Sequence, residues 1–179
     1  FKNTAFQEYN IPKLTIEGNL TSHELREAMR SYKGLPVHME VYTEDGSPKQ
    51  EYPFTVESAN FTVKPIQHKA TNKHACFQVL SSESITYTYD RNPEDPRIKH
   101  SMVLESDDLG KTIKDATLFY PRVKRPVGGN TVPDHVWEEQ KKLHIIYNET
   151  EYSNDIDQKE SYRLRLPFQS RTFEVNGIA

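Results

Sequence analysis

The chain has 179 residues, enough for one domain or two small ones, and only 35% of them are hydrophobic. Its 23 basic and 26 acidic residues are mixed along the sequence and give a net charge of -3, so no basic stripe is present that would neutralise a nucleic acid backbone. No apolar run approaches the roughly 20 residues of a transmembrane helix.

The first predicted element is a helix from His23 to Lys33. Thr21 and Glu24 have the spacing of a capping box, in which each side chain hydrogen-bonds the backbone of the other residue. Gly34 suits the left-handed position after a helix, and Pro36 prevents its continuation. The apolar stripe of this helix consists of Leu25, Ala28 and Met29. Residues 1–20 are expected to be extended chain or a short strand.

From Pro36 onward, apolar and polar residues alternate with the period of strands. The expected connections are too short for a crossover helix, so neighbouring strands are predicted to be antiparallel. Turns are predicted at Asp45-Gly46 and at Asp107–Gly110. The strands are expected around Val37/Met39/Val41, Phe54/Val56, Phe61/Val63, Phe77/Val79, Ile85/Tyr87/Tyr89, Ile98–Leu104 and Ala116–Tyr120.

Residues 121–133 hold three prolines and a Gly-Gly pair, which predicts the longest loop and a candidate internal boundary. A short helix capped by Asp134 is expected over 134–142, followed by a strand at Leu143/Ile145/Tyr147. Residues 154–161 are expected to be a loop. Tyr162–Leu166 and Thr172–Val175 are predicted to form a final strand pair, interrupted by Pro167.

The pattern as a whole predicts a mainly β fold. We expect an antiparallel meander of about nine to eleven short strands with one short N-terminal helix, arranged as a curved sheet or shell. The sequence starts at Phe1 without a signal-peptide pattern, so residues 1–179 are interpreted as a single fragment of a larger chain. Unpaired sheet edges of such a fragment are places where other segments add strands.

Catalytic and ligand-binding patterns are weak throughout. The seven histidines lack metal-ligand spacing, and neither a phosphate-binding loop nor a nucleophile elbow is found, so we expect no metal, no cofactor and no catalytic residue. Cys76, between Ala75 and Phe77, is interpreted as a buried structural cysteine, with a contact to His74 as the alternative. Acidic pairs such as Asp107-Asp108 are interpreted as solvated turns.

Two long stretches carry a family resemblance: LREAMRSYKGLPVHMEVYTEDG at 25–46 and TYTYDRNPEDPRIKHSMVLESDDLG at 86–110. They resemble the B component of insecticidal Tc toxin complexes, in the region called TcdB middle/C-terminal. The later stretches IIYNETEYSNDID and YRLRLPFQSRTFEV continue the likeness in the same order. The resemblance implies a secreted, non-enzymatic segment between a β-propeller and an RHS-type shell, where the shell encloses the toxic part of the C component.

The resemblance also implies partners and structural residues. The partners would be other parts of the same parent chain, the C component and, through the propeller, the A component, without nucleic acid or membrane insertion. The prolines would fix a loop, the arginines would clamp it through Asp95 or carbonyl oxygens, and Gly110 would permit a tight turn. The implied residues are Arg91, Pro93, Asp95, Pro96, Arg97 and Gly110.

Two other function classes remain open at this point. The first is a free-standing β-sandwich module that binds carbohydrate or protein, which would show a compact closed core and a row of exposed tyrosines. The tyrosines to map for it are Tyr42, Tyr52, Tyr87 and Tyr89. The second is an enzyme such as a hydrolase, which the lack of an acid, base and nucleophile set disfavours.

Overall fold

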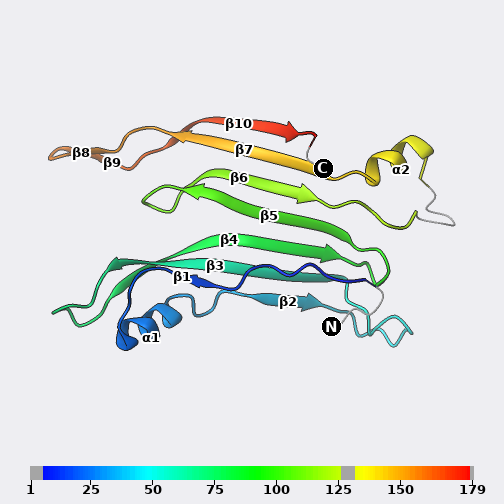
Figure 1. Cartoon of the computed structure of the whole chain (residues 1–179), viewed down its shortest axis with the longest axis horizontal. Coiled ribbons are helices and arrows are strands. Elements are labelled where there is room, and N and C mark those ends of the chain that lie inside the picture. Colours follow the sequence, from blue (N-terminus) through cyan, green and yellow to red (C-terminus); the bar gives the residue numbers. More distant parts are fainter. Residues whose placement is uncertain (1–5, 126–131, 178–179) are drawn as a thin grey trace.

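The computed structural model describes residues 6–125 and 132–177, and within them it contains ten strands and two helices (Figure 1). The mainly β fold and the expected number of strands are confirmed. The second helix, α2, lies where a short helix was expected over 134–142, in addition to the N-terminal one. The elements are β1 (Thr15–Ile16), α1 (Ser22–Ser31), β2 (His38–Val41), β3 (Thr55–Gln67), β4 (Cys76–Thr88), β5 (Arg97–Ser106), β6 (Thr112–Phe119), α2 (Asp134–Gln140), β7 (His144–Tyr152), β8 (Ile156–Gln158), β9 (Ser161–Arg163) and β10 (Pro167–Val175).

Eight of the strands form one sheet in the order β1-β3-β4-β5-β6-β7-β10, with β2 also paired to β3. β8 and β9 form a small second sheet that extends from the end of β7 and β10 (Figure 1). Neighbours from β2 onward are antiparallel, as predicted. The one parallel pair among the described strands joins β1 to β3 and lies outside the stretch for which antiparallel pairing was expected.

The strands β3 and β4 are longer than the sequence pattern indicated. Each has 13 residues and joins two segments that were predicted as separate strands. In the sequence, Ser81 and Ser82 indicate a polar connection between two strands, yet they lie inside β4. The register between the two strands shifts at Asn60/Phe61, and this β-bulge lets the strand continue through the polar residues.

Helix α1 starts with the predicted capping box. The Thr21 hydroxyl accepts the N–H of Glu24 at 3.3 Å, and the Glu24 carboxylate accepts the N–H of Thr21 at 2.9 Å. The predicted apolar stripe is only partly buried, because Ala28 is enclosed while Leu25 and Met29 are 46% and 48% exposed. Glu24 takes the buried place beside Ala28, since its carboxylate binds the segment between β3 and β4.

The C-terminal third departs from the prediction in three places. α2 is capped by Pro133 without a side-chain hydrogen bond, and Asp134 is its first residue instead of its cap. The expected loop at 154–161 contains β8, which pairs with β9. β10 pairs with β7 and not with β9, and Pro167 begins it beside a register shift, a position where a strand tolerates proline.

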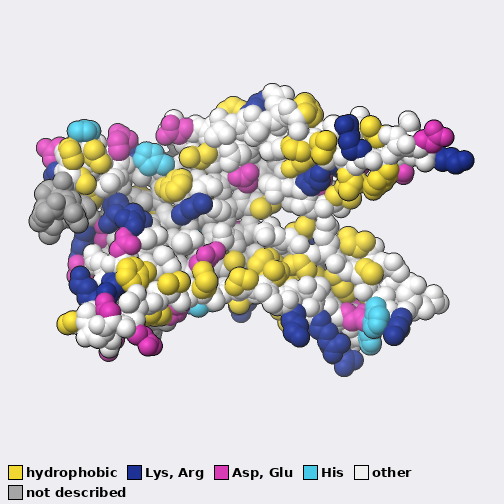
Figure 2. Space-filling model, turned by 180° about the vertical axis from the view of Figure 1, so that it is seen from behind, with side chains coloured by type: hydrophobic (Ala, Val, Ile, Leu, Met, Phe, Trp, Pro, Cys, Tyr) yellow, Lys and Arg dark blue, Asp and Glu magenta, His cyan; other side chains and the backbone are white. Residues whose placement is uncertain are grey.

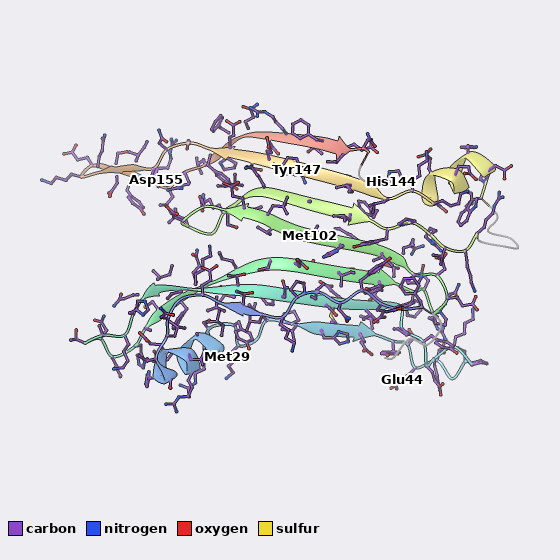
Figure 3. All side chains as sticks on the ribbon, in the orientation of Figure 1. Met29, Glu44, Met102, His144, Tyr147 and Asp155 are labelled. Atoms are coloured by element: carbon purple, nitrogen blue, oxygen red, sulfur yellow. The ribbon has the colours of Figure 1, made fainter. Side chains whose placement is uncertain are left out.

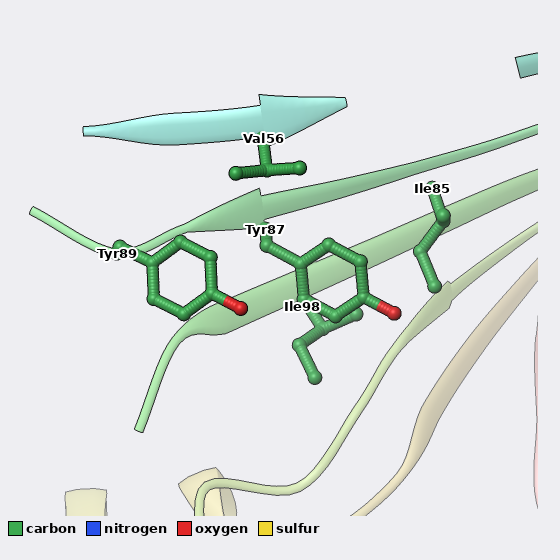
Figure 4. Packing of buried hydrophobic residues seen from close by; sticks show 5 residues of the cluster. All are labelled: Val56, Ile85, Tyr87, Tyr89 and Ile98. Carbon is green, nitrogen blue, oxygen red and sulfur yellow. The ribbon is translucent and has the colours of Figure 1, made fainter. Parts of the chain in front are cut away.

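The buried core lies on one face of the sheet. Val56, Tyr87 and Ile98 are cross-strand neighbours in β3, β4 and β5, and Ile85 and Tyr89 complete the cluster (Figure 4). The N-terminal segment covers this cluster: Phe6 and Ile11 pack against it, and the Tyr9 N–H donates to the Tyr87 hydroxyl at 2.7 Å. We call this side of the sheet the core face.

The opposite face, which we call the open face, carries a row of small side chains. Ala59, Ser84, Ser101 and Thr117 are register partners across β3, β4, β5 and β6. A groove of about 410 Å³ lies over Ala59, Ser84 and Ser101 of this row, with Leu35 and Phe61 among its walls. Apolar side chains also gather in a band along the lower strands in Figure 2, and the exposed apolar residues include Met39 and Val41 of β2 and Val37 just before it.

Neither helix in the described ranges has the length and apolarity that crossing a bilayer demands.

Candidate functional site

The loop after β4 is held by the half-buried guanidinium of Arg91. Arg91 donates from Nη1 to Asp45 Oδ2 at 2.8 Å, from Nε to the Lys49 carbonyl at 3.2 Å, and from Nη2 to the Ser47 hydroxyl. Its guanidinium also lies over the Phe54 ring, 5.6 Å from the centroid. These bonds tie the loop before β3 to the loop after β4, and the side-chain bond from Arg91 lowers the pKa of Asp45 to about 2.

Asp95 binds a different arginine from the ones that the resemblance implied. Its carboxylate accepts from Nε of Arg122 at 2.8 Å and from the N–H of Val123 at 2.9 Å, and the residue is 6% exposed. The neighbouring arginines were expected to bind either Asp95 or carbonyl oxygens. Arg91 binds a carbonyl oxygen, that of Lys49, whereas Asp95 connects to the loop after β6. Charge-assisted bonds of this kind are stronger than neutral ones.

The remaining residues of this loop set its path. Asp90 and Arg91 both have positive φ values, 50° and 64°, so the chain leaves β4 through two left-handed residues. Pro96 is buried and Pro93 is half-buried. Arg97 pairs with Asp90 at 2.5 Å on the surface, where an ion pair contributes little.

Gly110 lies at the other end of β5, in the turn to β6. Its φ is +80°, and a Cβ built on it would lie 2.5 Å from Nε2 of Gln78 and 2.6 Å from Cδ2 of Leu80. Asp107 organises this turn by accepting the N–H groups of Leu109 and Lys111 at 2.9 Å and 2.8 Å. The Asp107 side chain is 7% exposed, so the interpretation of this acidic pair as a solvated turn was wrong for Asp107.

Arg165 joins this turn to the end of β7. Its Nη1 lies 3.2 Å from Oδ2 of Asp107, and its Nη2 lies 2.7 Å from Oδ2 of Asp155. Figure 3 shows Asp155 beyond the end of β7 opposite to His144. The side-chain bond from Arg165 lowers the pKa of Asp155, and the Lys111 ammonium lies 5.2 Å from the centre of the Tyr152 ring.

The structure thus places the six residues from the sequence at two separate junctions. Arg91, Pro93, Asp95, Pro96 and Arg97 lie at one end of β5, and Gly110 lies at the other. Sequence reasoning missed the distant partners of Arg91 and Asp95, and the arginine that binds Asp107 in the turn of Gly110. Those partners follow no local pattern, because they lie between 27 and 58 residues away from the residues they bind. They are Asp45, Arg122 and Arg165.

A cavity of about 290 Å³ lies beside the first junction, between β5, β6, the start of β7 and α2. Ile98, Phe119, Tyr120 and Val136 are among its walls. Its cations are bound to carboxylates: Arg97 to Asp90, Arg122 to Asp95 and Lys142 to Glu139. The cavity is therefore suited to an apolar group.

Other candidate chemistry is dispersed. Cys76 is exposed at the start of β4, which corrects its interpretation as a buried residue, and Nδ1 of His74 lies 2.7 Å from Glu27 instead of contacting the thiol. Within the described ranges, His, Cys, Asp and Glu side chains form no group of three or more that could hold a metal ion.

Comparison with known proteins places this geometry in a family. Residues 27–166 match the family model described as the insecticide toxin TcdB middle/C-terminal region. Comparison with curated proteins gives no match. The fold is similar to that in a crystal structure of TcdB2-TccC3, with 23% identity, a TM-score of 0.75, and coverage of 97% of this chain and 9% of that chain.

A structure of the Photorhabdus luminescens Tc holotoxin pore shows the same likeness. Its identity is 22%, its TM-score is 0.74, and the alignment covers 98% of this chain and 9% of that chain. The chain therefore spans about one tenth of the length of the solved chains that it resembles. Since the family model matches most of the sequence, this chain belongs to the TcdB middle/C-terminal region family of insecticidal Tc toxins.

Proposed function

We propose that this chain is a non-enzymatic structural segment of the B component of a secreted insecticidal toxin complex. Its sheet would form part of a β-sheet shell that encloses and delivers the toxic part of the C component. The observation that carries the proposal is the single layer of long strands. The described residues form one eight-stranded sheet with no second sheet stacked on it.

The two faces of that sheet are consistent with a position in the shell. The core face is closed by the N-terminal segment, whereas the open face has the groove over Ala59, Ser84 and Ser101. The outer edge of β10 pairs with no other strand in the described part of the chain. Such an edge supports continuation of the sheet by another segment of the parent chain. In this proposal, residues 1–179 are one fragment, and the internal boundary at 121–133, of which 126–131 lie outside the described residues, stays a prediction.

The two junctions support a structural role for the motif residues. We propose that Arg91, Pro93, Asp95, Pro96 and Gly110 fix the ends of the strands, because they bind or shape loops and leave no reactive group poised toward a cavity. The relatives named above contain TccC3 beside TcdB2 or form part of a holotoxin pore. The partners proposed for the parent protein are accordingly the C component and, through the propeller, the A component.

The alternative of a free-standing β-sandwich binding module fits less well. Tyr87 and Tyr89 are each 2% exposed and belong to the core, whereas Tyr42 and Tyr52 are exposed in the connection between β2 and β3. The four tyrosines therefore do not form one binding row. A sandwich also needs two stacked sheets, which the described residues lack.

Site-specific photocrosslinking tests whether one face of the sheet lines the space that holds the toxic part of the C component. Ser101 and Met102 are consecutive in β5, so their side chains point to opposite faces. A benzophenone amino acid is placed at each position in the parent B component, which is then assembled with the C component and irradiated. We expect crosslinks to the enclosed part of the C component from one position only. Crosslinks from both positions or from neither would overturn the proposal.

A further inference from the structure

One corner of the molecule carries a concentration of positive charge. Helix α1 and the connection between β3 and β4 form a projection there, which we call the basic prong (residues 21–33 and 67–76). It has five basic and two acidic residues, a net charge of +3, whereas the whole chain has a net charge of -3. Figure 2 shows Lys and Arg side chains gathered along this lower projection. The basic residues are Arg26, Arg30, Lys33, Lys69 and Lys73.

None of these five cations has an ion-pair partner among the described residues, whereas most described arginines outside the prong have one. In the part of the chain that the structure describes, none of them lies within 4.0 Å of a carboxylate oxygen. Elsewhere arginines are paired as a rule. The paired arginines are Arg91, Arg97, Arg122, Arg125, Arg165 and Arg171. The charge of the prong is therefore not neutralised within the described residues.

The two carboxylates of the prong face inward and hold it together. Glu24 accepts the backbone N–H of Lys69 at 2.8 Å and lies 3.1 Å from Nδ1 of His68. Glu27 accepts the backbone N–H of Ala75 at 2.9 Å and lies 2.7 Å from Nδ1 of His74. Because these bonds fix α1 against the connection between β3 and β4, the cations are presented from a preorganised surface.

Apolar side chains lie between the cations. Leu25 and Met29 are one helical turn apart and half-exposed, and Arg26 and Arg30 form the adjacent stripe (Met29 is labelled in Figure 3). The surface therefore offers positive charge and apolar area together. An acidic polypeptide with interspersed apolar side chains complements both properties.

A nucleic acid or a membrane surface would complement the basic prong less completely. A nucleic acid backbone would engage the cations but leave Leu25 and Met29 without a partner, and the nearby ring of Tyr32 is half-buried. Helices that lie in a bilayer surface bury a continuous apolar face, whereas Ala28 of this ten-residue helix is already packed inside the protein. We propose that the basic prong is a docking surface for an acidic, partly apolar segment of a partner polypeptide.

The experiment measures binding of a fluorescein-labelled peptide that alternates glutamate with leucine, by fluorescence anisotropy on the 179-residue chain. We expect saturable binding that weakens as salt is added, since exposed charges are screened over about 10 Å at 0.1 M ionic strength. The Lys69→Glu/Lys73→Glu variant should bind about tenfold more weakly, because two attractions become repulsions. Circular dichroism spectra that match the parent chain confirm that the variant is folded.

The matched control reverses two cations on the opposite projection, at β8 and β9. The Lys159→Glu/Arg163→Glu variant has the same net charge as the prong variant and should bind like the parent chain. Equal weakening in both variants would show that only net charge matters and would overturn the proposal. So would tighter binding to phosphatidylserine vesicles or to double-stranded DNA than to the acidic peptide.

Discussion

Nη2 of Arg122 lies 2.7 Å from Oδ2 of Asp95, and this ion pair connects two loops that are 27 residues apart in the sequence. The carboxylate is almost wholly buried and also accepts the N–H of Val123. The loop after β4 and the loop after β6 are thereby fixed to one another at one end of β5. The pair is a structural contact that holds two turns of the sheet in register.

Removal of this carboxylate should destabilise the protein strongly. In Asp95→Ala, Arg122 and the N–H of Val123 lose a buried partner, and we expect the free energy of unfolding to fall by about 3 kcal/mol. Urea unfolding followed by circular dichroism measures the change. Arg97→Ala is the control, because its pair with Asp90 is exposed, and it should cost under about 1 kcal/mol. Equal losses in the two variants would contradict this assignment.

Glycine at position 110 is required for two reasons at once. In Gly110→Ala, the residue must adopt a φ of +80°, and its Cβ meets Gln78 and Leu80 at 2.5 Å and 2.6 Å. We expect a loss of about 2 to 3 kcal/mol, from left-handed strain and displacement of the β4 side chains.

Gly34→Ala separates the two causes. Gly34 has a φ of +92°, but a Cβ there would meet nothing within 4 Å, so only the strain of about 1 kcal/mol remains. Thermal unfolding of the two variants should show the larger decrease of the midpoint for Gly110→Ala. A larger decrease for Gly34→Ala would rule out crowding at the β5 to β6 turn.

Glu24 should make the free energy of unfolding depend on pH at acidic pH. Hydrogen bonds from the backbone of Thr21 and Lys69 lower its pKa to about 2 from the ordinary value of 4.5. The unfolded chain therefore binds a proton at higher pH than the folded chain does. The stabilisation by this carboxylate is complete above pH 4.5 and is lost as the pH falls toward about 2.

The Glu24→Gln variant isolates this contribution. Other carboxylates with lowered pKa, such as those of Glu27 and Asp45, are common to both proteins and cancel in the comparison. The difference in unfolding free energy between parent and variant should be largest above pH 4.5 and shrink below it. Urea unfolding at a series of pH values provides the measurement, and a difference that does not change with pH would refute the expectation.

The open edge of β10 should promote self-association. Its outer side pairs with no other described strand, and Phe168 and Phe173 are exposed along it. We expect the average mass from light scattering to increase with concentration. Lysine at an exposed edge position, in Ser170→Lys, should reduce the increase, while the same change at Ser22, at the exposed start of α1 and away from β10, should not. A strict monomer at all concentrations would contradict the prediction.

Local signals in the sequence predicted local structure well. The capping box of Thr21 and Glu24 and the turn at Gly110 were both confirmed, because each depends on residues within a few positions of one another. The strand alternation gave the mainly β fold for the same reason. The extent of β3 and β4 was underestimated, since a bulge at Ser82 carries the strand through polar residues that otherwise indicate a turn.

Contacts between distant segments could not be predicted. Asp95 or carbonyl oxygens were expected to bind the neighbouring arginines, and the partner of Asp95 is Arg122, which follows another strand. Cys76 was interpreted as buried from its apolar neighbours, but it lies at the exposed start of β4. The same limit applies to α1, where Leu25 and Met29 resemble a core stripe although Glu24 holds the helix to the sheet.

β1 and β2 share one edge of β3, the first in parallel and the second in antiparallel orientation. The chain therefore leaves this edge before α1 and returns to the same edge after it. Because the ladder of β3 is complete without α1, insertions or sequence divergence in that excursion leave the order of the strands intact. This corner can therefore change in sequence and in its contacts while the sheet beside it keeps the same strands.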